Sequence, residues 1–219
     1  MAKVVEKFVS INGEGPHAGE IAAFIRFKGC NLNCSYCDTR WANCDDVPYT
    51  EESVEQLTEW IRQTACNNVT LTGGEPLLQE DIVPIIDSLA ALGCRVEIET
   101  NGSIELAECF KNRERVCYTM DYKLPSSGME KAMNKSNFQV LGRHDSVKFV
   151  SGTKEDLDRA KQIIEEYDLT NRCHVFISPV FGSISPAEIV SYLISNNMNH
   201  VRLQLQMHKF IWDPDKRGV

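Results

Sequence analysis

The chain has 219 residues, of which 42% are hydrophobic and 25% charged, and its formal net charge at pH 7 is −8. This length supports one substantial core, so we expect a single globular domain over residues 1–219. The acidic balance, without a long basic block, argues against a nucleic-acid partner, and no apolar run is long enough to predict a membrane span.

In chain order, the hydrophobic pattern predicts strands that alternate with helices. After a short alternating segment without the features of a signal peptide, the predicted strands are residues 21–27, 69–71, 95–100, 116–121, 147–150, 174–178 and 201–206. The predicted helices begin at a cap on Thr50, cover residues 81–92 and 153–167, and begin again at Ser185 with a capping-box pattern. Alternation of this kind builds a parallel sheet.

Several predicted strands have one apolar and one polar face. In residues 95–100, Val96 and Ile98 oppose Glu97 and Glu99. Strands covered by helices on both faces are apolar throughout, so the polar face indicates a cavity, although a solvated sheet edge gives the same pattern. A complete eightfold barrel has roughly 250 residues. We therefore expect an α/β fold, an abbreviated βα barrel of six to seven mostly parallel strands, with a doubly wound open sheet as the alternative.

The polar motifs of the chain follow the predicted strands at their carboxyl ends. They occupy residues 29–37, 72–76, 99–102, 121–123, 151–152 and 206–209. Because the carboxyl ends of parallel strands meet at one edge, these motifs are expected to share one rim, where the sites of such folds form.

Three of these residues, Cys30, Cys34 and Cys37, are cysteines within a short segment. The expected compartment is the cytoplasm, where nine cysteines, an odd number, indicate reduced thiols or metal ligands. A closed zinc site takes four protein ligands, which Cys44 or His17 would complete. An iron–sulfur cube held by three cysteines instead leaves one iron open for another molecule, and the spacing alone leaves both alternatives open.

The other motifs also have structural as well as functional interpretations. Residues 72–76 are either a tight strand-to-helix turn, or a place where two glycines admit a ligand and Glu75 offers a carboxylate to an ammonium. Arg26 is either paired with a glutamate or a forked donor for a carboxylate. Thr39 either caps a turn or binds a hard cation such as magnesium. Asn101 precedes a glycine, by default as part of a turn.

Together these residues resemble a known family. The spacing Cys30-x3-Cys34-x2-Cys37 and residues 73–76 resemble the radical S-adenosylmethionine superfamily. Residues 12–16, 24–30 and 37–39 narrow the similarity to the 7-carboxy-7-deazaguanine synthases, and residues 99–102, 121–128 and 206–212 extend it over nearly the whole chain. Members of that family often have glutamine in place of Asn12 and a longer cysteine loop.

The resemblance implies a reaction that composition does not show. Such a carbon–nitrogen lyase converts 6-carboxy-5,6,7,8-tetrahydropterin to 7-carboxy-7-deazaguanine with loss of ammonia, on the route to queuosine. The implied cofactors are a 4Fe-4S cluster, S-adenosyl-L-methionine as a recycled radical source, and Mg²⁺. An electron-donating reductase and a homodimer are implied as partners. Because the cofactor supplies the radical, no side chain is expected to be catalytic with certainty.

Position by position, the resemblance implies three groups of site residues. The metal ligands would be Cys30, Cys34 and Cys37 for the cluster and Thr39 for magnesium. The residues that contact S-adenosylmethionine would be Gly74, Glu75, Thr100, Asn101, Asp121, Lys123 and Ser126. The residues that contact the pterin would be Ile11, Asn12 and Gly13 through backbone groups, Arg26 through the pterin carboxylate, and Thr72, Gln206 and His208.

Two other functions stay open. A glycyl-radical activating enzyme of similar size would need a protein partner and would leave residues 12–16 unexplained. A zinc-stabilised binding module without catalysis would be colourless, whereas the enzyme would be brown and oxygen-sensitive, with about four irons per chain.

Overall fold

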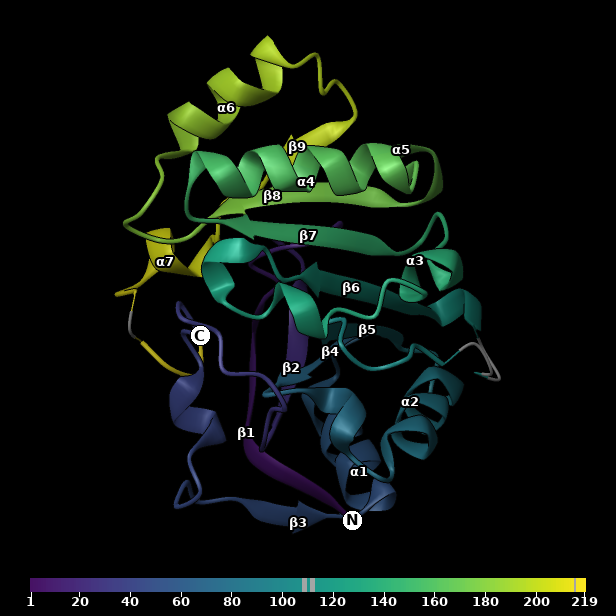
Figure 1. Ribbon diagram of the computed structural model, residues 1–219. Coiled ribbons are helices and arrows are strands. Elements are labelled where there is room, and N and C mark those ends of the chain that lie inside the picture. The colour runs from purple at the N-terminus through teal and green to yellow at the C-terminus, as the bar shows by residue number, and fades with distance from the viewer. Residues whose placement is uncertain (108–109, 111–112, 215) are drawn as a thin grey trace.

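The computed structural model describes residues 1–107, 110, 113–214 and 216–219. Within these residues, nine strands form one sheet in the order β3-β1-β2-β4-β5-β6-β7-β8-β9 (Figure 1). The strands are β1 (Ala2–Ile11), β2 (Ile21–Phe27), β3 (Thr50–Glu52), β4 (Asn68–Gly73), β5 (Arg95–Thr100), β6 (Val116–Tyr122), β7 (Ser146–Ser151), β8 (His174–Pro179) and β9 (Val201–Leu203).

The sheet is mostly parallel, as expected from the sequence. From β2 through β4 to β9, each strand is parallel to the next, whereas β1 pairs antiparallel with both β2 and β3. Over the described part of the chain the sheet ends at β3 on one side and β9 on the other, so it forms a partial barrel.

Helices cover the outer face of this sheet. The α-helices are α1 (Val54–Thr64), α2 (Ile82–Ala91), α3 (Asn137–Val140), α4 (Lys154–Glu166), α5 (Leu169–Arg172), α6 (Pro186–Ser195) and α7 (His208–Ile211). In Figure 1, α1 and α2 lie side by side and α4 lies along β7 and β8.

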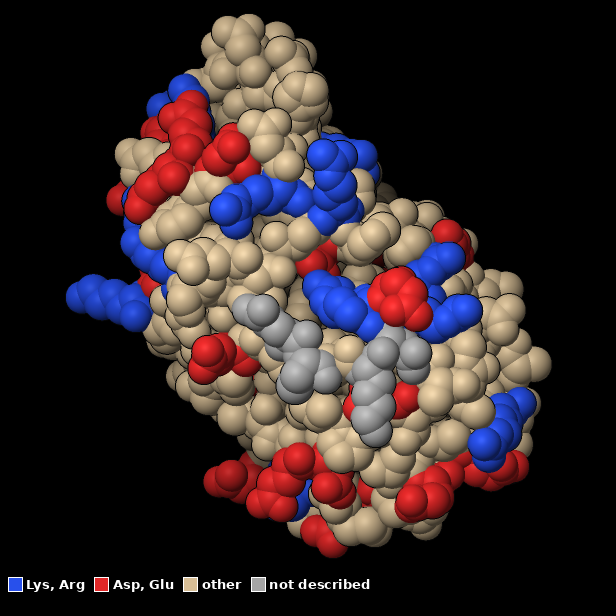
Figure 2. All heavy atoms as spheres, turned by 90° about the vertical axis from the view of Figure 1, so that its right-hand side faces the viewer, with Lys and Arg blue, Asp and Glu red and all other residues tan. Residues whose placement is uncertain are grey.

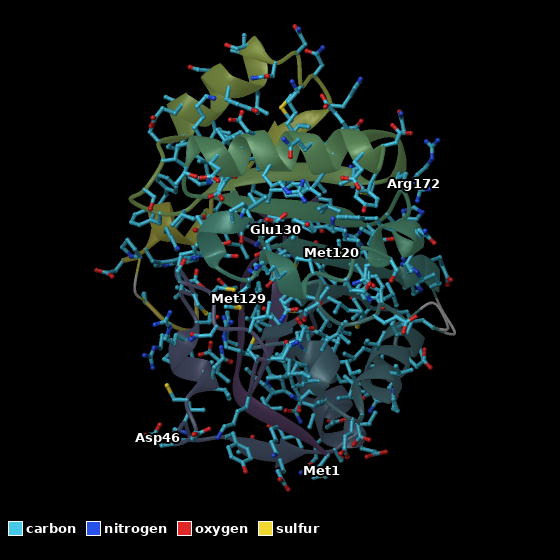
Figure 3. All side chains as sticks on the ribbon, in the orientation of Figure 1. Met1, Asp46, Met120, Met129, Glu130 and Arg172 are labelled. Carbon is cyan, nitrogen blue, oxygen red and sulfur yellow. The ribbon has the colours of Figure 1, made fainter. Side chains whose placement is uncertain are left out.

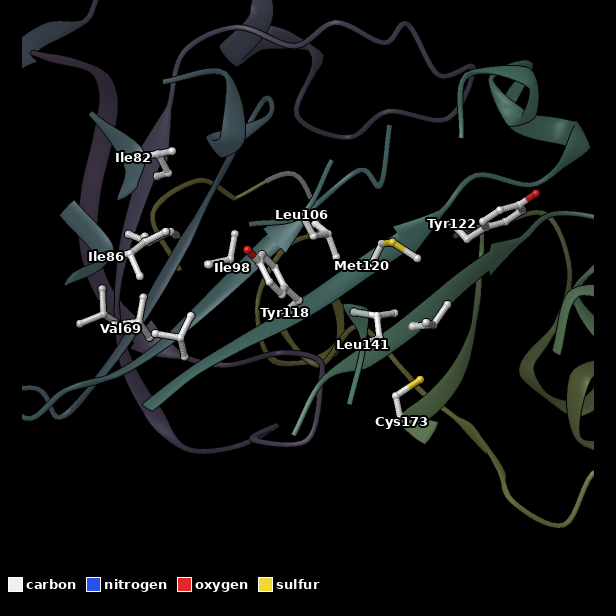
Figure 4. Packing of buried hydrophobic residues seen from close by; sticks show 14 of the residues in the cluster. Val69, Ile82, Ile86, Ile98, Leu106, Tyr118, Met120, Tyr122, Leu141 and Cys173 are labelled. Carbon is white, nitrogen blue, oxygen red and sulfur yellow. The ribbon is translucent and has the colours of Figure 1, made fainter. Parts of the chain in front are cut away.

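The hydrophobic core lies between these helices and the outer face of the strands. Val96 and Ile98 of β5 are fully buried there with Ile86 of α2 (Figure 4). Met120 of β6, labelled in Figures 3 and 4, is only 1% exposed. Because side chains alternate along a strand, Glu97 of β5 points to the opposite face, which is the interior of the partial barrel. The polar faces predicted from the sequence therefore line an interior and are not sheet edges.

The predicted hydroxyl caps are confirmed for two helices and wrong for one, and the helix expected over residues 81–92 is α2. The hydroxyls of Thr153 and Ser185 cap α4 and α6 as expected. Thr50 caps no helix, because residues 50–52 pair with β1 as β3, and Ser53 caps α1 in a reciprocal bond pair with Gln56. A serine three residues downstream therefore takes the role expected of the threonine.

The two ends of the chain also differ from the expected strands. The N-terminal alternating segment is a full strand, β1, which runs antiparallel to β2 over Val4 to Ile11. The last strand ends at Leu203, so residues 204–206 form an irregular connection to α7. Gln206 and His208 consequently lie beyond the sheet and not on a strand face.

Figure 2 shows the end of the molecule at which the parallel strands begin, opposite to their carboxyl ends. Lys and Arg side chains gather across the middle of this face, and Asp and Glu side chains gather along its lower edge and at its upper left. Arg95 begins β5 there, and Arg115 directly precedes β6. No helix in the described ranges combines the length and apolar character needed to cross a membrane.

Candidate functional site

A broad cavity of about 720 Å³ lies at the carboxyl ends of the strands. Its walls come from four parts of the chain: the end of β1 and the turn after it, the loop that carries the three cysteines, the ends of the parallel strands, and the C-terminal segment after β9. In Figure 1 the C-terminus lies beside the cysteine loop, and Gly218 and Val219 line the cavity on that side. Five of the six motifs expected to share one rim contribute to this cavity, whereas residues 151–152 do not line it.

Most of the site residues expected from the sequence line this cavity. They are Ile11, Gly13, Arg26, Cys30, Cys34, Cys37, Thr39, Thr72, Gly74, Thr100, Asn101, Asp121, Lys123, Gln206 and His208. Three expected residues lie behind its wall: Asn12, Glu75 and Ser126.

The cysteine loop is held against the rest of the rim by hydrogen bonds. The Ser35 amide donates to the carbonyl of Ser127 at 3.1 Å, and the Arg40 guanidinium donates to the carbonyl of Cys34 at 2.9 Å. The side-chain amide of Asn101 donates to Cys30 Sγ at 3.5 Å. A donor aimed at a cysteine sulfur is the type of contact that tunes a metal-bound thiolate.

The three thiols surround a cavity and do not converge on one ion. Among the described residues, no three His, Cys, Asp or Glu side chains are placed to hold a single metal ion. The Cys44 thiol, considered above as a fourth zinc ligand, donates to the carbonyl of Arg40 at 3.5 Å. Burial raises the pKa of the Cys34 thiol, so its thiolate needs a neighbouring cation, and a metal centre would supply one.

The two glycines after β4 are required by backbone packing. A Cβ on Gly74 would lie 1.8 Å from the carbonyl oxygen of Gly29, and Gly73 has a φ of +140° with its Cβ position 2.3 Å from the carbonyl oxygen of Phe27. Only glycine allows both the conformation and this close approach. Both glycines thus serve backbone packing, and both also line the cavity.

Glu75 is fully buried, and its carboxylate is occupied by protein donors. It accepts hydrogen bonds from the Thr100 hydroxyl at 2.9 Å, the Asn101 amide at 2.6 Å and the Leu77 amide at 3.0 Å. Ser126 is similar, because its amide and hydroxyl donate to the carboxylate of Asp156 at the start of α4. Both residues hold the cavity wall from behind.

The floor of the cavity contains a buried ammonium among carboxylates. Lys148 of β7 donates to Glu14 at 3.0 Å and lies 3.9 Å from Asp121, which also pairs with Lys123 at 2.8 Å. Burial lowers the pKa of Lys148, but the charges of Glu14 and Asp121 outweigh it and raise that pKa well above its usual value. The second oxygen of Asp121, Oδ1, is buried without a hydrogen-bond partner among the described atoms.

Sequence reasoning did not assign Glu14 or Lys148. Glu14 lay within the segment at 12–16 that carries the resemblance, without a role of its own. Lys148 offered a signal, because it is a lone cation in the apolar run of residues 146–151. A buried lysine in a strand requires an acidic partner.

Arg26 combines both interpretations considered above. Its Nε donates to Glu6 at 2.7 Å, and the side chain lines the cavity. Thr72 also lines it while its hydroxyl donates to Glu99 at 2.7 Å. These hydrogen bonds fix the orientation of both side chains. The bond to Glu6 uses Nε of Arg26, so the two outer nitrogens of its guanidinium can still bind a ligand.

The C-terminal segment after β9 contacts the turn that follows β1 and so closes the cavity on that side. The Met207 amide donates to the carbonyl of Gly13 at 3.2 Å, and Lys209 pairs with Asp38 of the cysteine loop at 3.3 Å. The guanidinium of Arg217 lies 4.0 Å from the ring centre of Trp41. Gln206 and His208 thereby reach the cavity from outside the sheet.

Comparisons with known proteins agree with this arrangement. A model described as the radical SAM superfamily matches residues 24–118. The chain is 52% identical over 218 residues to a curated 7-carboxy-7-deazaguanine synthase of Clostridium acetobutylicum, with 99% of each chain covered. It is 38% identical to one of Methanospirillum hungatei, over 97% of this chain and 86% of the other.

Solved structures show the same relationship. The chain superposes on the crystal structure of QueE from Escherichia coli with a TM-score of 0.76 and 25% identity, over 94% of both chains. Streptococcus suis SuiB bound to S-adenosylmethionine gives a TM-score of 0.57 at 12% identity, over 83% of this chain and 48% of the other. The likeness to SuiB concerns the fold alone.

Proposed function

Because the chain belongs to the family of 7-carboxy-7-deazaguanine synthases, which are radical S-adenosylmethionine enzymes, we propose that it contracts the ring of 6-carboxy-5,6,7,8-tetrahydropterin. The product is 7-carboxy-7-deazaguanine, and ammonia is released, so the enzyme is a carbon–nitrogen lyase. The observation that carries this proposal is the convergence of three thiols, Gly74, Asn101 and Arg26 on one cavity of about 720 Å³.

The residues of the rim fit the cofactors of this family. Cys30, Cys34 and Cys37 would hold a 4Fe-4S cluster, since three thiols spaced around a cavity suit a cube that reaches between them. When bound, the cluster would supply the one-electron chemistry by which S-adenosylmethionine serves as a radical source. The Thr39 hydroxyl, on the same wall, would bind Mg²⁺, which retains waters and takes its other ligands from substrate.

S-adenosylmethionine would lie against Gly74, Thr100, Asn101, Asp121 and Lys123. The unpartnered Asp121 Oδ1 provides an acceptor for a hydroxyl or ammonium group of that ligand. Glu75 and Ser126 would act from behind: Glu75 fixes Thr100 and Asn101, and Ser126 joins the cysteine loop to α4.

The pterin would lie against the first turn and the end of β2. Gly13 and Ile11 present backbone there, Arg26 faces the carboxylate, and Thr72, Gln206 and His208 complete the polar wall. Asn12 supports this wall but does not form it, because its amide donates to Glu20 and its carbonyl accepts from Gly19. Enclosure by the C-terminal segment would exclude water from reactive intermediates.

We also propose partners and a compartment. Reductive cleavage takes one electron that neither substrate nor S-adenosylmethionine supplies, so a reductase must deliver it. Phe181, Phe210 and Ile211 are 53%, 65% and 50% exposed, which offers an apolar surface for a homodimer. The free thiols of the described cysteines accord with the cytoplasm, and the continuous sheet accords with one domain over residues 1–219.

An anaerobic assay tests the proposed reaction. The chain, reconstituted with iron and sulfide, is mixed with the carboxytetrahydropterin, S-adenosylmethionine, Mg²⁺ and dithionite. We expect the deazaguanine product by mass spectrometry. Cleavage of S-adenosylmethionine without that product would support a glycyl-radical activating enzyme instead, and a colourless chain that retains zinc would support a binding module.

Replacing Arg26 by alanine is expected to weaken substrate binding roughly 10- to 150-fold. A hydrogen bond to a charged group contributes about 1.5–3 kcal/mol, and this variant removes such a bond to the pterin carboxylate. The measurement is the substrate KM in the anaerobic assay. Arg62→Ala on α1, whose side chain is 57% exposed, is the matched control. An unchanged KM in Arg26→Ala would remove the carboxylate-binding role.

A further inference from the structure

Two glutamates of β5 point into the interior of the partial barrel, and only one reaches the cavity. Glu99 lines the cavity, whereas Glu97, two residues earlier on the same face, is 4% exposed and lies beneath the floor. Nothing in the proposed chemistry uses Glu97. Burial of a carboxyl group costs folding free energy unless the group is hydrogen-bonded or paired.

Glu97 contacts β6 on one side and the turn after β1 on the other. Its Oε1 accepts from the Thr119 hydroxyl of β6 at 2.5 Å, and its Oε2 accepts from the side-chain amide of Asn12 at 3.5 Å. The same Oε1 lies 2.8 Å from the position that a Cβ would take on Gly15. Glu97 therefore holds segment 12–15 by a hydrogen bond at Asn12 and lies close against the backbone at Gly15.

The segment supported in this way carries part of the cavity wall. Gly13 lines the cavity, and Glu14 reaches Lys148 at 3.0 Å and accepts from the Ser178 hydroxyl at 3.4 Å. A shift of Asn12 would move both Gly13 and Glu14. Glu97 can therefore influence the substrate without touching it.

We propose that Glu97 is a positioning residue, an inference that rests on the proposed function. Glu97 holds segment 12–15 in the geometry that binds the pterin. Its carboxyl group faces the Thr119 hydroxyl and the Cys117 thiol on β6, Lys148 on β7, Glu14 on the segment itself, and Glu99 on its own strand. Carboxylates thus outnumber cations around it.

The charge of Glu97 makes substrate binding dependent on pH. Burial, and next the charge of Glu99, raise the pKa of Glu97 to about 7, against the lowering effects of Thr119 and Lys148. Above that pH a further negative charge lies beneath a cavity that must accept a carboxylate-bearing substrate. We expect the substrate KM of the parent chain to rise about tenfold between pH 6 and pH 8.5, one decade for one added unit charge close to the site.

Glu97→Gln tests the proposal, because glutamine keeps the shape and cannot ionise. We expect its KM to stay within about twofold of the parent at pH 6 and to lose the rise toward pH 8.5, with kcat little changed. Glu97→Ala removes the support itself, so its KM should be raised at every pH. Glu20→Gln, an exposed glutamate at the end of the same turn, is the matched control and should keep the parent profile.

Two further readouts separate positioning from general stability and from the reaction. Anaerobic isothermal titration calorimetry with the pterin, without S-adenosylmethionine, gives the affinity at each pH even if turnover is absent. The Tm of Glu97→Gln should exceed that of the parent at pH 8 but not at pH 5, since the raised pKa costs the parent stability as pH rises from about 4.5 to 7.

The results test the proposed reaction and the role of Glu97 separately. A parent chain that binds the pterin but makes no deazaguanine contradicts the proposed function and leaves the affinity profiles to test Glu97. Affinity profiles of Glu97→Gln and Glu97→Ala that coincide with the parent from pH 6 to pH 8.5 overturn the positioning role.

Discussion

Replacing Cys30 by alanine is expected to abolish cluster assembly and reductive cleavage of S-adenosylmethionine while leaving the chain folded. Three thiols are the minimum that holds a cube, and Cys30 is the one to which Asn101 donates at 3.5 Å. Iron per chain should fall from about four to well below one. Cleavage should fall more than about 10³-fold, because no other group of the chain generates the radical. The measurements are iron analysis, visible absorption and release of 5′-deoxyadenosine.

Cys44→Ala is the matched control for this variant. Cys44 ends the same loop, is exposed, and donates to the carbonyl of Arg40. It should keep its iron and its cleavage activity. Equal metal loss in Cys30→Ala and Cys44→Ala would instead indicate a four-ligand zinc site, and cleavage at the parent rate in Cys30→Ala would contradict the mechanism.

The parts of the site that follow strand ends were predictable from the sequence. Polar residues at the carboxyl ends of parallel strands must meet at one edge, so the convergence of Arg26, Asn101 and Asp121 followed from periodicity alone. Periodicity did not predict the chemistry of the site. That prediction depended on the cysteine spacing and the neighbouring segments, which resemble those of a known family.

The parts that could not be predicted are those in which one residue type serves two purposes. A glycine–glycine–glutamate turn is compatible with ligand contact and with backbone packing, and only the approach of Gly74 to Gly29 and the three donors to Glu75 distinguish them. Thr50 has the side chain of a helix cap but is paired with β1, because tertiary pairing outweighs local preference.

Long-range ion pairs are a second limit of sequence reasoning. Glu14 and Lys148 are 134 positions apart, and only the closing of the sheet brings their charged groups to 3.0 Å. Neither periodicity nor motif spacing contains that information. The Glu14–Lys148 pair is nevertheless central to the cavity floor, and we expect the loss of Lys148 to lower stability strongly.

Replacing Lys148 by methionine is expected to lower the free energy of unfolding by about 3–5 kcal/mol at pH 8, the usual cost of leaving a buried charge unpaired. The variant leaves Glu14 and Asp121 without their shared cation in a floor where Lys148 was only 8% exposed. The measurement is urea denaturation followed by circular dichroism. Lys154→Met on α4, whose side chain is 78% exposed, should change stability by no more than about 0.5 kcal/mol.

A second substitution identifies the cause of this loss. Without the ammonium, Glu14 lacks its partner in the cavity floor, whereas Asp121 keeps its pair with Lys123 at 2.8 Å. Adding Glu14→Gln to Lys148→Met should recover part of the loss at pH 8, because the unpaired charge is gone. A loss that is unaffected by Glu14→Gln would mean that Lys148 contributes packing by its aliphatic chain and not charge compensation.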